Sequence, residues 1–276
     1  MRAEIIRNSI RVAAARALSS TASRTVPRQQ TRLVFTAMSI PHDIQEFLAN
    51  YPDATDETNN SDNYLFYSNQ LPCQPDNLLI DRFHARFGGD YDELEYRHGY
   101  IQWLFPIQED GMNLQAQALQ PHEIVSMNGD NKVQSRLITS YKMMLHFYGM
   151  SLANQDTGLL SRSPDYNSRY SHLQRSMHNN LRITRILKCL SELGLEYLNA
   201  GFLLHVLSEQ SENGKLDTRN IKGSMDRWWA NCIRDDHERE WIGRVIRKAR
   251  NAGDFTFTRE MYESALTARK THGRFE

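Results

Sequence analysis

Residues 178–193 read His178-Asn-Asn-Leu-Arg-Ile-Thr-Arg-Ile-Leu-Lys-Cys-Leu-Ser-Glu-Leu193, and this stretch decides the fold. On a helix of about 3.6 residues per turn its apolar side chains gather on one face, while basic side chains gather elsewhere. The same period recurs from Pro41 onward, and the alternating pattern of strands is scarce. We therefore expect an all-α fold over residues 39–276: a single compact multi-helix domain of about eight or nine helices, with no sheet.

Three of the expected helices have well-marked ends. The periodic pattern predicts one unbroken helix over Tyr166–Leu193, which ends at Gly194. It also predicts helices over Asp90–Phe105, stopped by Pro106, and over Ile221–Arg234. Between the periodic segments, Tyr51–Asp62 is expected to be a polar linker and Asn154–Pro164 a polar loop.

The charge is unevenly distributed along the chain. The 276 residues carry 33 basic and 33 acidic side chains, but residues 1–40 hold seven Arg and one acid. The remaining residues, 41–276, therefore have a net charge of −6, which argues against nucleic-acid binding by bulk electrostatics. The basic, Ser-rich and nearly acid-free residues 1–38 are typical of a mitochondrial transit peptide. A disordered tail without a targeting role and a translation start at Met38 fit the same composition.

Several classes of protein are excluded or disfavoured by what the sequence lacks. Its apolar stretches are far shorter than the roughly 20 residues of a transmembrane helix. Three scattered cysteines make a poor disulfide framework and fit a reducing compartment, with Cys189 and Cys232 as small core residues. No phosphate-binding loop, nucleophile elbow or zinc-ligand spacing is present. We expect no cofactor, no metal site and no catalytic residues.

Three blocks in order resemble the conserved domain of the opioid growth factor receptor family. They are Tyr100-Ile-Gln-Trp-Leu-Phe-Pro-Ile107 followed by Gly111-Met-Asn113, then Arg136-Leu-Ile-Thr-Ser-Tyr-Lys-Met-Met-Leu-His-Phe-Tyr-Gly149, then Ser176-Met-His-Asn-Asn-Leu-Arg-Ile-Thr-Arg-Ile-Leu-Lys-Cys-Leu-Ser-Glu-Leu-Gly194. Tyr64-Leu-Phe-Tyr-Ser-Asn-Gln-Leu71 resembles the segment that leads into them. The match is strongest over residues 63–210, and residues 211–276 are expected to be a helical C-terminal part. The sequence looks like a short member of the family, without the long acidic N-terminus and basic C-terminal repeats of vertebrate members.

The resemblance implies a non-enzymatic signalling protein. Named vertebrate members bind the pentapeptide Met-enkephalin, associate with membranes or the nuclear rim, and restrain proliferation. By resemblance we expect a receptor for a short opioid peptide, cytoplasmic or perinuclear with peripheral membrane association, or mitochondrial if residues 1–38 are a transit peptide. At position 114 this chain has Leu114, where vertebrate members carry an aromatic residue.

A second hypothesis is an α-helical adaptor that binds another protein or RNA, in mitochondria if the leader is real. The segment Arg219–Arg250 holds nine basic and five acidic residues and is the only basic stretch of residues 41–276. A solvated face of mixed ion pairs is the structural alternative for this segment.

Candidate ligand-binding residues come from two of the family blocks. Aromatic side chains could line a groove for a peptide, and polar side chains of the 178–193 helix could hold its acidic end. These candidates are Tyr100, Trp103, Phe105, His178, Asn179, Arg182 and Arg185. The alternatives are that the aromatic residues are core and that the basic residues pair with acids of neighbouring helices.

Three tryptophans are candidates for a protein interface: Trp228, Trp229 and Trp241. Adjacent side chains on a helix point about 100° apart, so one ring of the Trp228–Trp229 pair should be buried. The other ring would then be exposed or covered by a partner.

Overall fold

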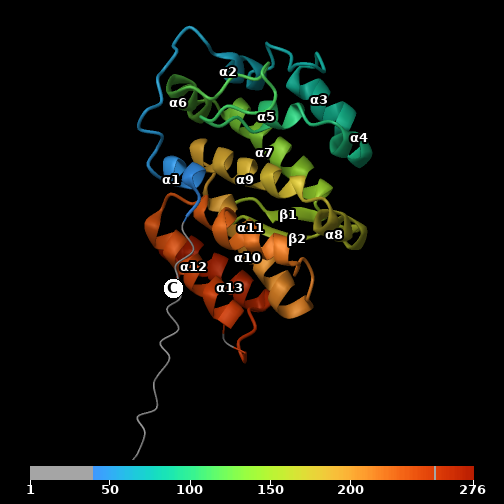
Figure 1. Cartoon of the computed structure of the whole chain (residues 1–276), viewed down its shortest axis with the longest axis vertical. Coiled ribbons are helices and arrows are strands. Elements are labelled where there is room, and N and C mark those ends of the chain that lie inside the picture. The colour runs from blue at the N-terminus through green and yellow to red at the C-terminus, as the bar shows by residue number, and fades with distance from the viewer. Residues whose placement is uncertain (1–39, 252) are drawn as a thin grey trace, which may run out of the picture. The chain divides into compact units, whose positions relative to one another are not determined.

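Thirteen α-helices, one 3₁₀-helix and one β-hairpin form the described part of the chain, residues 40–251 and 253–276 of a computed structural model (Figure 1). The expected all-α class is confirmed. The predictions made for residues 1–38, a leader or transit peptide, lie outside the described residues. The elements are α1 (His42–Leu48), α2 (Asp62–Tyr67), α3 (Ile80–Phe87), α4 (Tyr91–Tyr96), α5 (Tyr100–Leu104), α6 (Pro121–Gly129), α7 (Asn131–Phe147), β1 (Met150–Asn154), β2 (Leu159–Arg162), α8 (Tyr166–Arg175), α9 (His178–Glu192), α10 (Tyr197–Asn213), α11 (Arg219–Arg227), η1 (Trp229–Asn231), α12 (Asp236–Asn251) and α13 (Arg259–His272).

Helix breaks explain why the described residues hold more helices than the eight or nine expected. The helix predicted over Tyr166–Leu193 stops at Ser176, whose backbone leaves the helical region with ψ at 83°, so that α8 and α9 are separate. The helix predicted over Asp90–Phe105 is broken at Arg97, which is extended with ψ at 140°. Apolar periodicity continues across both breaks, because each shorter helix keeps its own buried side.

The expectation of no sheet is wrong at one place. Strands β1 and β2 pair antiparallel, with Met150 opposite Arg162 and a register shift after Leu152. The hairpin turns at Gly158, where φ is +78°, and that glycine packs against Gly201 of α10. A Cβ atom on Gly201 would lie 1.9 Å from the Gly158 carbonyl oxygen, so the two glycines allow the hairpin to lie directly on the helix.

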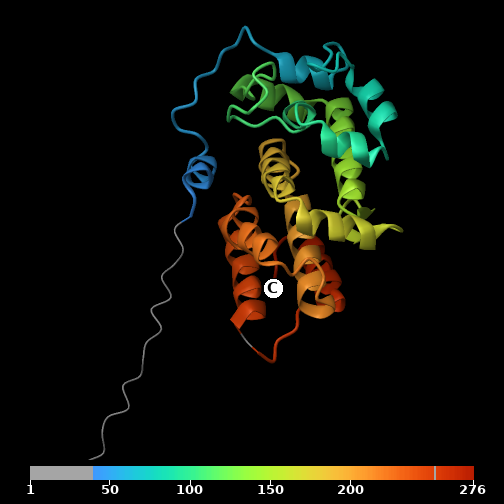
Figure 2. The same ribbon diagram turned by 45° about the vertical axis from the view of Figure 1, so that its right-hand side comes forward.

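Helix α10 is the most deeply buried element. Every residue from Leu198 to Gln210 is buried, and the helix contacts α9, α12, α13 and β2 (Figure 2). On the other side of α9, helices α2, α3 and α6 pack against α7. Several buried polar groups of α10 have partners: the Asn199 amide donates to the Cys232 carbonyl at 2.8 Å, and Glu209 pairs with Arg162 at 2.7 Å, whereas Asn199 Oδ1 and His205 Nδ1 have none among the described residues. A helix buried on all sides needs such partners, because unpaired polar groups are costly away from water.

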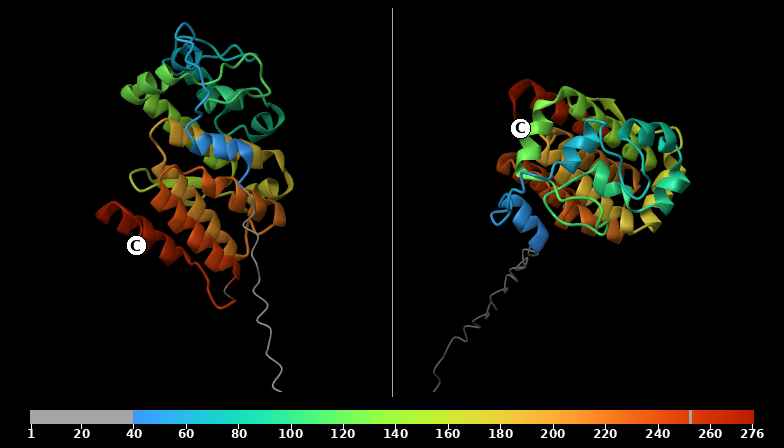
Figure 3. Two further views of the ribbon diagram at one scale, coloured as in Figure 1. Left: turned by 60° about the vertical axis from the view of Figure 1, so that its left-hand side comes forward. Right: turned by 90° about the horizontal axis from the view of Figure 1, so that it is seen from above.

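Helix α1 lies against α9 (Figure 3) and is held there by buried charges. Lys188 of α9 has a side chain that is 2% exposed, and its Nζ lies 3.0 Å from Asp43 Oδ2 and 2.6 Å from Glu109 Oε1. The Arg234 guanidinium covers the Phe47 ring at 4.3 Å from its centroid and pairs with Glu192 at 2.7 Å. The buried ammonium group of Lys188 therefore joins α9 to Asp43, which is 145 positions away in the sequence.

None of the helices in residues 40–251 and 253–276 has the length and apolar character needed to cross a bilayer.

Candidate functional site

In the first family block, residues 100–113, the side chains of Gln102 and Asn113 form a hydrogen-bond network with the backbone, which we call the Gln102–Asn113 lock. Gln102 donates from Nε2 to the Asn113 carbonyl at 3.1 Å and accepts the Asn113 N–H at 2.6 Å. The Asn113 amide in turn donates to the carbonyls of Gln74 and Gly99 at 2.8 and 3.1 Å. A Cβ atom on Gly111 would lie 2.1 Å from Gln102 Nε2, so only glycine fits beside the lock. The spacing between Gln102, Gly111 and Asn113 is therefore explained by the loop after α5, whose conformation these residues hold.

The three aromatic candidates of this block lie in the core. Tyr100 and Phe105 are 0% exposed and Trp103 is 2% exposed. The Trp103 indole donates to the Gln74 carbonyl at 3.0 Å, and the Tyr100 hydroxyl donates to the Leu94 carbonyl at 2.9 Å. Their rings offer no open surface to a ligand in this structure, which matches the core alternative.

Two basic candidates of α9, Arg182 and Arg185, donate hydrogen bonds to backbone carbonyls. Arg182 is 5% exposed and donates to the carbonyls of Leu94 and Arg97 at 3.1 and 2.8 Å. Arg185 donates from Nε to the Phe105 carbonyl at 2.8 Å, and burial lowers the pKa of its guanidinium. Both arginines satisfy carbonyls at the ends of α4 and α5, which have no partner inside those short helices.

The remaining two candidate ligand-binding residues, His178 and Asn179, contact the carboxylate of Glu95 in α4. Glu95 lies 3.1 Å from His178 Nε2, 3.1 Å from His172 Nε2 and 3.1 Å from Asn179 Nδ2. Burial alone would raise the pKa of Glu95, but hydrogen bonds from Asn179 and His172 and the charge of both histidines lower it to about 2. His178 thus pairs with an acid of the neighbouring helix α4, as one of the alternatives predicted, whereas Arg185 donates to a backbone carbonyl instead.

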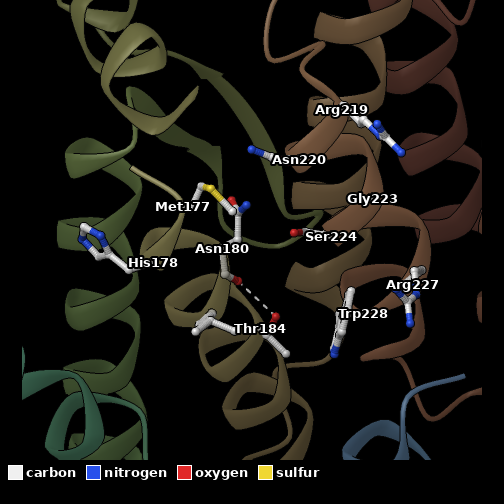
Figure 4. Close-up of a pocket in the computed structure, with 11 residues that line it drawn as sticks. Met177, His178, Asn180, Thr184, Arg219, Asn220, Gly223, Ser224, Arg227 and Trp228 are labelled. Carbon is white, nitrogen blue, oxygen red and sulfur yellow. Dashed lines mark hydrogen bonds between the residues drawn. The ribbon is translucent and has the colours of Figure 1, made fainter. Parts of the chain in front are cut away.

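The described residues enclose a groove of about 450 Å³ between α9 and α11 (Figure 4). Its α9 side is apolar at the surface: Met177 and Leu181, one turn apart, are 61% and 72% exposed. Thr184 continues the same side. Such a pair of large exposed apolar side chains next to a hollow is typical of a binding surface.

Two stripes of α11 form the opposite side of the groove. Asn220, Ser224 and Trp228 follow one another at intervals of four residues and face the space between the helices (Figure 4). The second stripe is Arg219, Gly223 and Arg227, in which the glycine leaves a gap between the two arginines; a Cβ atom there would meet nothing within 4 Å. At about 1.5 Å per residue, the two arginines are separated by about 12 Å along the helix.

Asn180 contributes an unused hydrogen-bond acceptor. The residue is 7% exposed, and its Oδ1 is buried without a donor among the described residues. Its backbone carbonyl, by contrast, accepts from the Trp229 indole at 3.1 Å and from Thr184 Oγ1 at 3.0 Å. A buried amide oxygen without a partner costs free energy, and a ligand N–H could satisfy it.

The adjacent tryptophans Trp228 and Trp229 differ in burial, as their positions on a helix predict. Trp229 is 0% exposed and packs edge-on against Phe202, whereas Trp228 is half-buried, lines the groove and carries the Arg227 guanidinium at 4.6 Å from its ring centroid. Trp241 lines a different hollow and stacks on Phe275 with centroids 4.5 Å apart. The expectation of one buried ring is confirmed, and the interface roles stay predictions.

Five of the nine basic residues of the stretch Arg219–Arg250 form ion pairs among the described residues, whereas Arg219, Arg227, Arg247 and Lys248 form none. Arg234 pairs with Glu192 at 2.7 Å, Arg244 with Glu240 at 2.9 Å and Arg250 with Asp226 at 3.2 Å. The mixed ion-pair face that the sequence left open thus accounts for part of the stretch, and the adaptor hypothesis stays a prediction.

Comparison with known proteins identifies the family. Residues 56–262 match the family model described as the opioid growth factor receptor (OGFr) conserved region. The chain belongs to the opioid growth factor receptor family. The matched region contains the Gln102–Asn113 lock, the Glu95 cluster and the whole α9–α11 groove.

Named relatives of this family cover most of the chain. The opioid growth factor receptor of Mus musculus is 39% identical over 199 residues, which are 71% of this chain and 31% of that protein. Opioid growth factor receptor-like protein 1 of Mus musculus is 37% identical over 208 residues, 75% of this chain and 44% of the relative. The human receptor is 36% identical over 202 residues, 72% of this chain and 30% of its own length. The chain thus spans less than half the length of these relatives, and no solved structure matches it.

The sequence predicted two residues of the groove, His178 and Trp228, and missed its other features. The apolar pair Met177 and Leu181 has the spacing of a helix face, but a helix predicted to run without a break over Tyr166–Leu193 gives no sign that these two residues stand at a helix start. Arg219 and Arg227 belong to the basic stretch Arg219–Arg250, and the charge pattern alone does not distinguish them from its other basic residues. Within residues 40–251 and 253–276 no group of three or more His, Cys, Asp or Glu side chains could hold a metal ion.

Proposed function

We propose that this chain is a non-enzymatic receptor-type domain that binds a short peptide of the Met-enkephalin class in the α9–α11 groove. The observation that carries the proposal is the composition of the groove. It combines the exposed apolar pair Met177 and Leu181 with the cations Arg219 and Arg227, and none of the described residues that line it is acidic. Apolar surface with a few convergent polar groups is the usual character of a ligand site.

The dimensions of the groove favour a short ligand. The about 12 Å between Arg219 and Arg227 corresponds to about four residues of an extended peptide at about 3.3 Å each. A pentapeptide with aromatic and Met side chains would place apolar groups against Met177, Leu181 and Trp228. Its C-terminal carboxylate, the one negative group of the peptide, would be attracted by the arginines.

The names of the relatives support the same class of function. They are called receptors or a receptor-like protein, and residues 56–262 of this chain match the conserved region of the family. The enkephalin specificity comes from the family resemblance, so the proposal needs a direct binding experiment.

Isothermal titration calorimetry of the full chain with Met-enkephalin tests the proposal. Leu181→Asp places a charge in the groove, and Val125→Asp is its matched control, since Leu181 is 72% and Val125 74% exposed, the latter on α6. We expect wild type and Val125→Asp to bind equally and Leu181→Asp to bind at least about tenfold more weakly. No heat at about 100 µM peptide with a folded sample would overturn peptide binding. Equal binding by all three proteins would contradict the assignment of the peptide to the α9–α11 groove.

Localisation is a separate part of the proposal. By family resemblance we propose peripheral association with a membrane or the nuclear envelope, and mitochondrial import as the alternative if residues 1–38 act as a transit peptide. Imaging of fluorescent fusions of the full chain and of a version that starts at Met38 distinguishes them. Import that depends on residues 1–37 would favour the mitochondrial alternative, and a shared perinuclear pattern would favour membrane association.

A further inference from the structure

We infer that the groove recognises the free C-terminal carboxylate of its peptide through Arg227, with the side chain of the last peptide residue against Trp228. This inference rests on the proposed function, and it adds which end of the ligand is bound and by which residues.

The first argument is that Arg227 is held in place with its charge unspent. Its guanidinium lies over the Trp228 ring, with Cζ 4.6 Å from the ring centroid. Its Nε is buried without an acceptor among the described residues. The neighbouring acid, Asp226, pairs instead with Arg250 at 3.2 Å. A planar guanidinium with free N–H donors matches the two oxygens of a carboxylate.

The second argument separates Arg227 from Arg219, the other cation of the groove. Arg219 is exposed at the start of α11, whereas Arg227 is half-buried beside an indole. A charge pair in water contributes little, and the same pair gains strength where the surroundings exclude water. The carboxylate is therefore better bound at the Arg227 end, where Trp228 also offers apolar surface to the last side chain.

The test compares Met-enkephalin with its C-terminal amide, using calorimetry on the full chain. We expect the wild type to bind the acid at least about tenfold more tightly than the amide, because a charge-assisted bidentate pair is lost. Arg227→Gln should bind both peptides equally, whereas the control variant Arg219→Gln should keep the preference for the acid. Circular dichroism verifies that both variants are folded.

The outcomes separate the two proposals. Equal affinity of acid and amide for the wild type overturns the carboxylate inference and leaves peptide binding in place. A preference that disappears in Arg219→Gln and persists in Arg227→Gln also overturns it. Binding of neither peptide overturns the inference together with the proposed function. The wild-type comparison needs no variant, so a failure of Arg227→Gln to fold does not prevent the test.

Discussion

Lys188 Nζ lies 2.6 Å from Glu109 Oε1, although the lysine side chain is only 2% exposed. The same ammonium group reaches Asp43 Oδ2 of α1 at 3.0 Å. One buried cation thus holds two acids from distant parts of the chain against the central helix α9. Removing such a cation leaves carboxylates with no compensating charge, so its contribution should be visible in the free energy of unfolding.

We therefore predict that Lys188→Met destabilises the fold by about 1 to 3 kcal/mol, because its partners Asp43 and Glu109 are 42% and 26% exposed and stay partly solvated. Lys142→Met is the control, because Lys142 is exposed and contacts only Gln155 at 3.2 Å. Its effect should stay within about 0.5 kcal/mol. Urea unfolding followed by circular dichroism measures both. Equal unfolding midpoints of the two variants would show that the Lys188 cluster contributes no stability.

The contact between the hairpin and α10 gives a second prediction. Gly201→Ala would place a Cβ atom 1.9 Å from the Gly158 carbonyl oxygen, so the hairpin must move away from the helix at a cost of about 2 kcal/mol or more. Gly223→Ala in α11 meets nothing within 4 Å and should stabilise by up to about 1 kcal/mol through helix propensity. Thermal unfolding of both variants measures the difference. A stabilised Gly201→Ala would contradict the close approach.

The Gln102–Asn113 lock predicts a strong dependence on one amide. Asn113→Ala removes the amide that donates to the carbonyls of Gln74 and Gly99; Gln74 keeps the Trp103 indole as a donor, so the loss should be about 1 kcal/mol or more. The neighbouring Leu114→Ala is the control, since Leu114 is 95% exposed and should change the stability by less than about 0.5 kcal/mol. Chemical unfolding compares them. Similar losses in both variants would argue against the lock.

Stability should decrease in acid because of a buried histidine. His205 Nε2 lies 2.9 Å from the Tyr170 hydroxyl, and burial lowers the pKa of His205 to about 3. In the unfolded chain the pKa is about 6.5, so the unfolded state binds more protons between these values. The stabilisation is complete above about pH 6.5 and falls towards pH 3 by up to about 1.4 kcal/mol per pH unit.

The measurement is the urea midpoint at several values between pH 7.5 and 4.5. His205→Gln should show a shallower decrease than the wild type, whereas a variant of the exposed His237, His237→Gln, should retain the full slope. Parallel curves for wild type and His205→Gln would refute the role of His205.

The sequence predicted the fold better than its details. The apolar period of residues 178–193 correctly predicted α9, because a core helix must keep one apolar face. The break at Ser176 was not predictable from that period, since α8 and α9 each continue it. The hairpin was missed because β2, Leu159–Arg162, has only four residues, and an alternating pattern needs more to stand out.

The site was harder to predict for a different reason. Closely spaced aromatic residues such as Tyr100 and Trp103 are found both in cores and in ligand grooves. Which of the two they form depends on how helices distant in the sequence pack around them. Arg182 donates to carbonyls more than 80 positions away, so no local pattern indicates that its charge is already used. The adjacent pair Trp228 and Trp229, by contrast, predicted that one ring is buried, but not which one.

Peptide binding in the α9–α11 groove is tested most directly by tryptophan fluorescence during titration with Met-enkephalin. Trp228 lines the groove, Trp229 and Trp103 are buried, and Trp241 lies in another hollow. We predict a saturable change in emission that persists in Trp241→Phe and disappears in Trp228→Phe. A change that persists in Trp228→Phe, or no change in the wild type, would contradict binding in this groove.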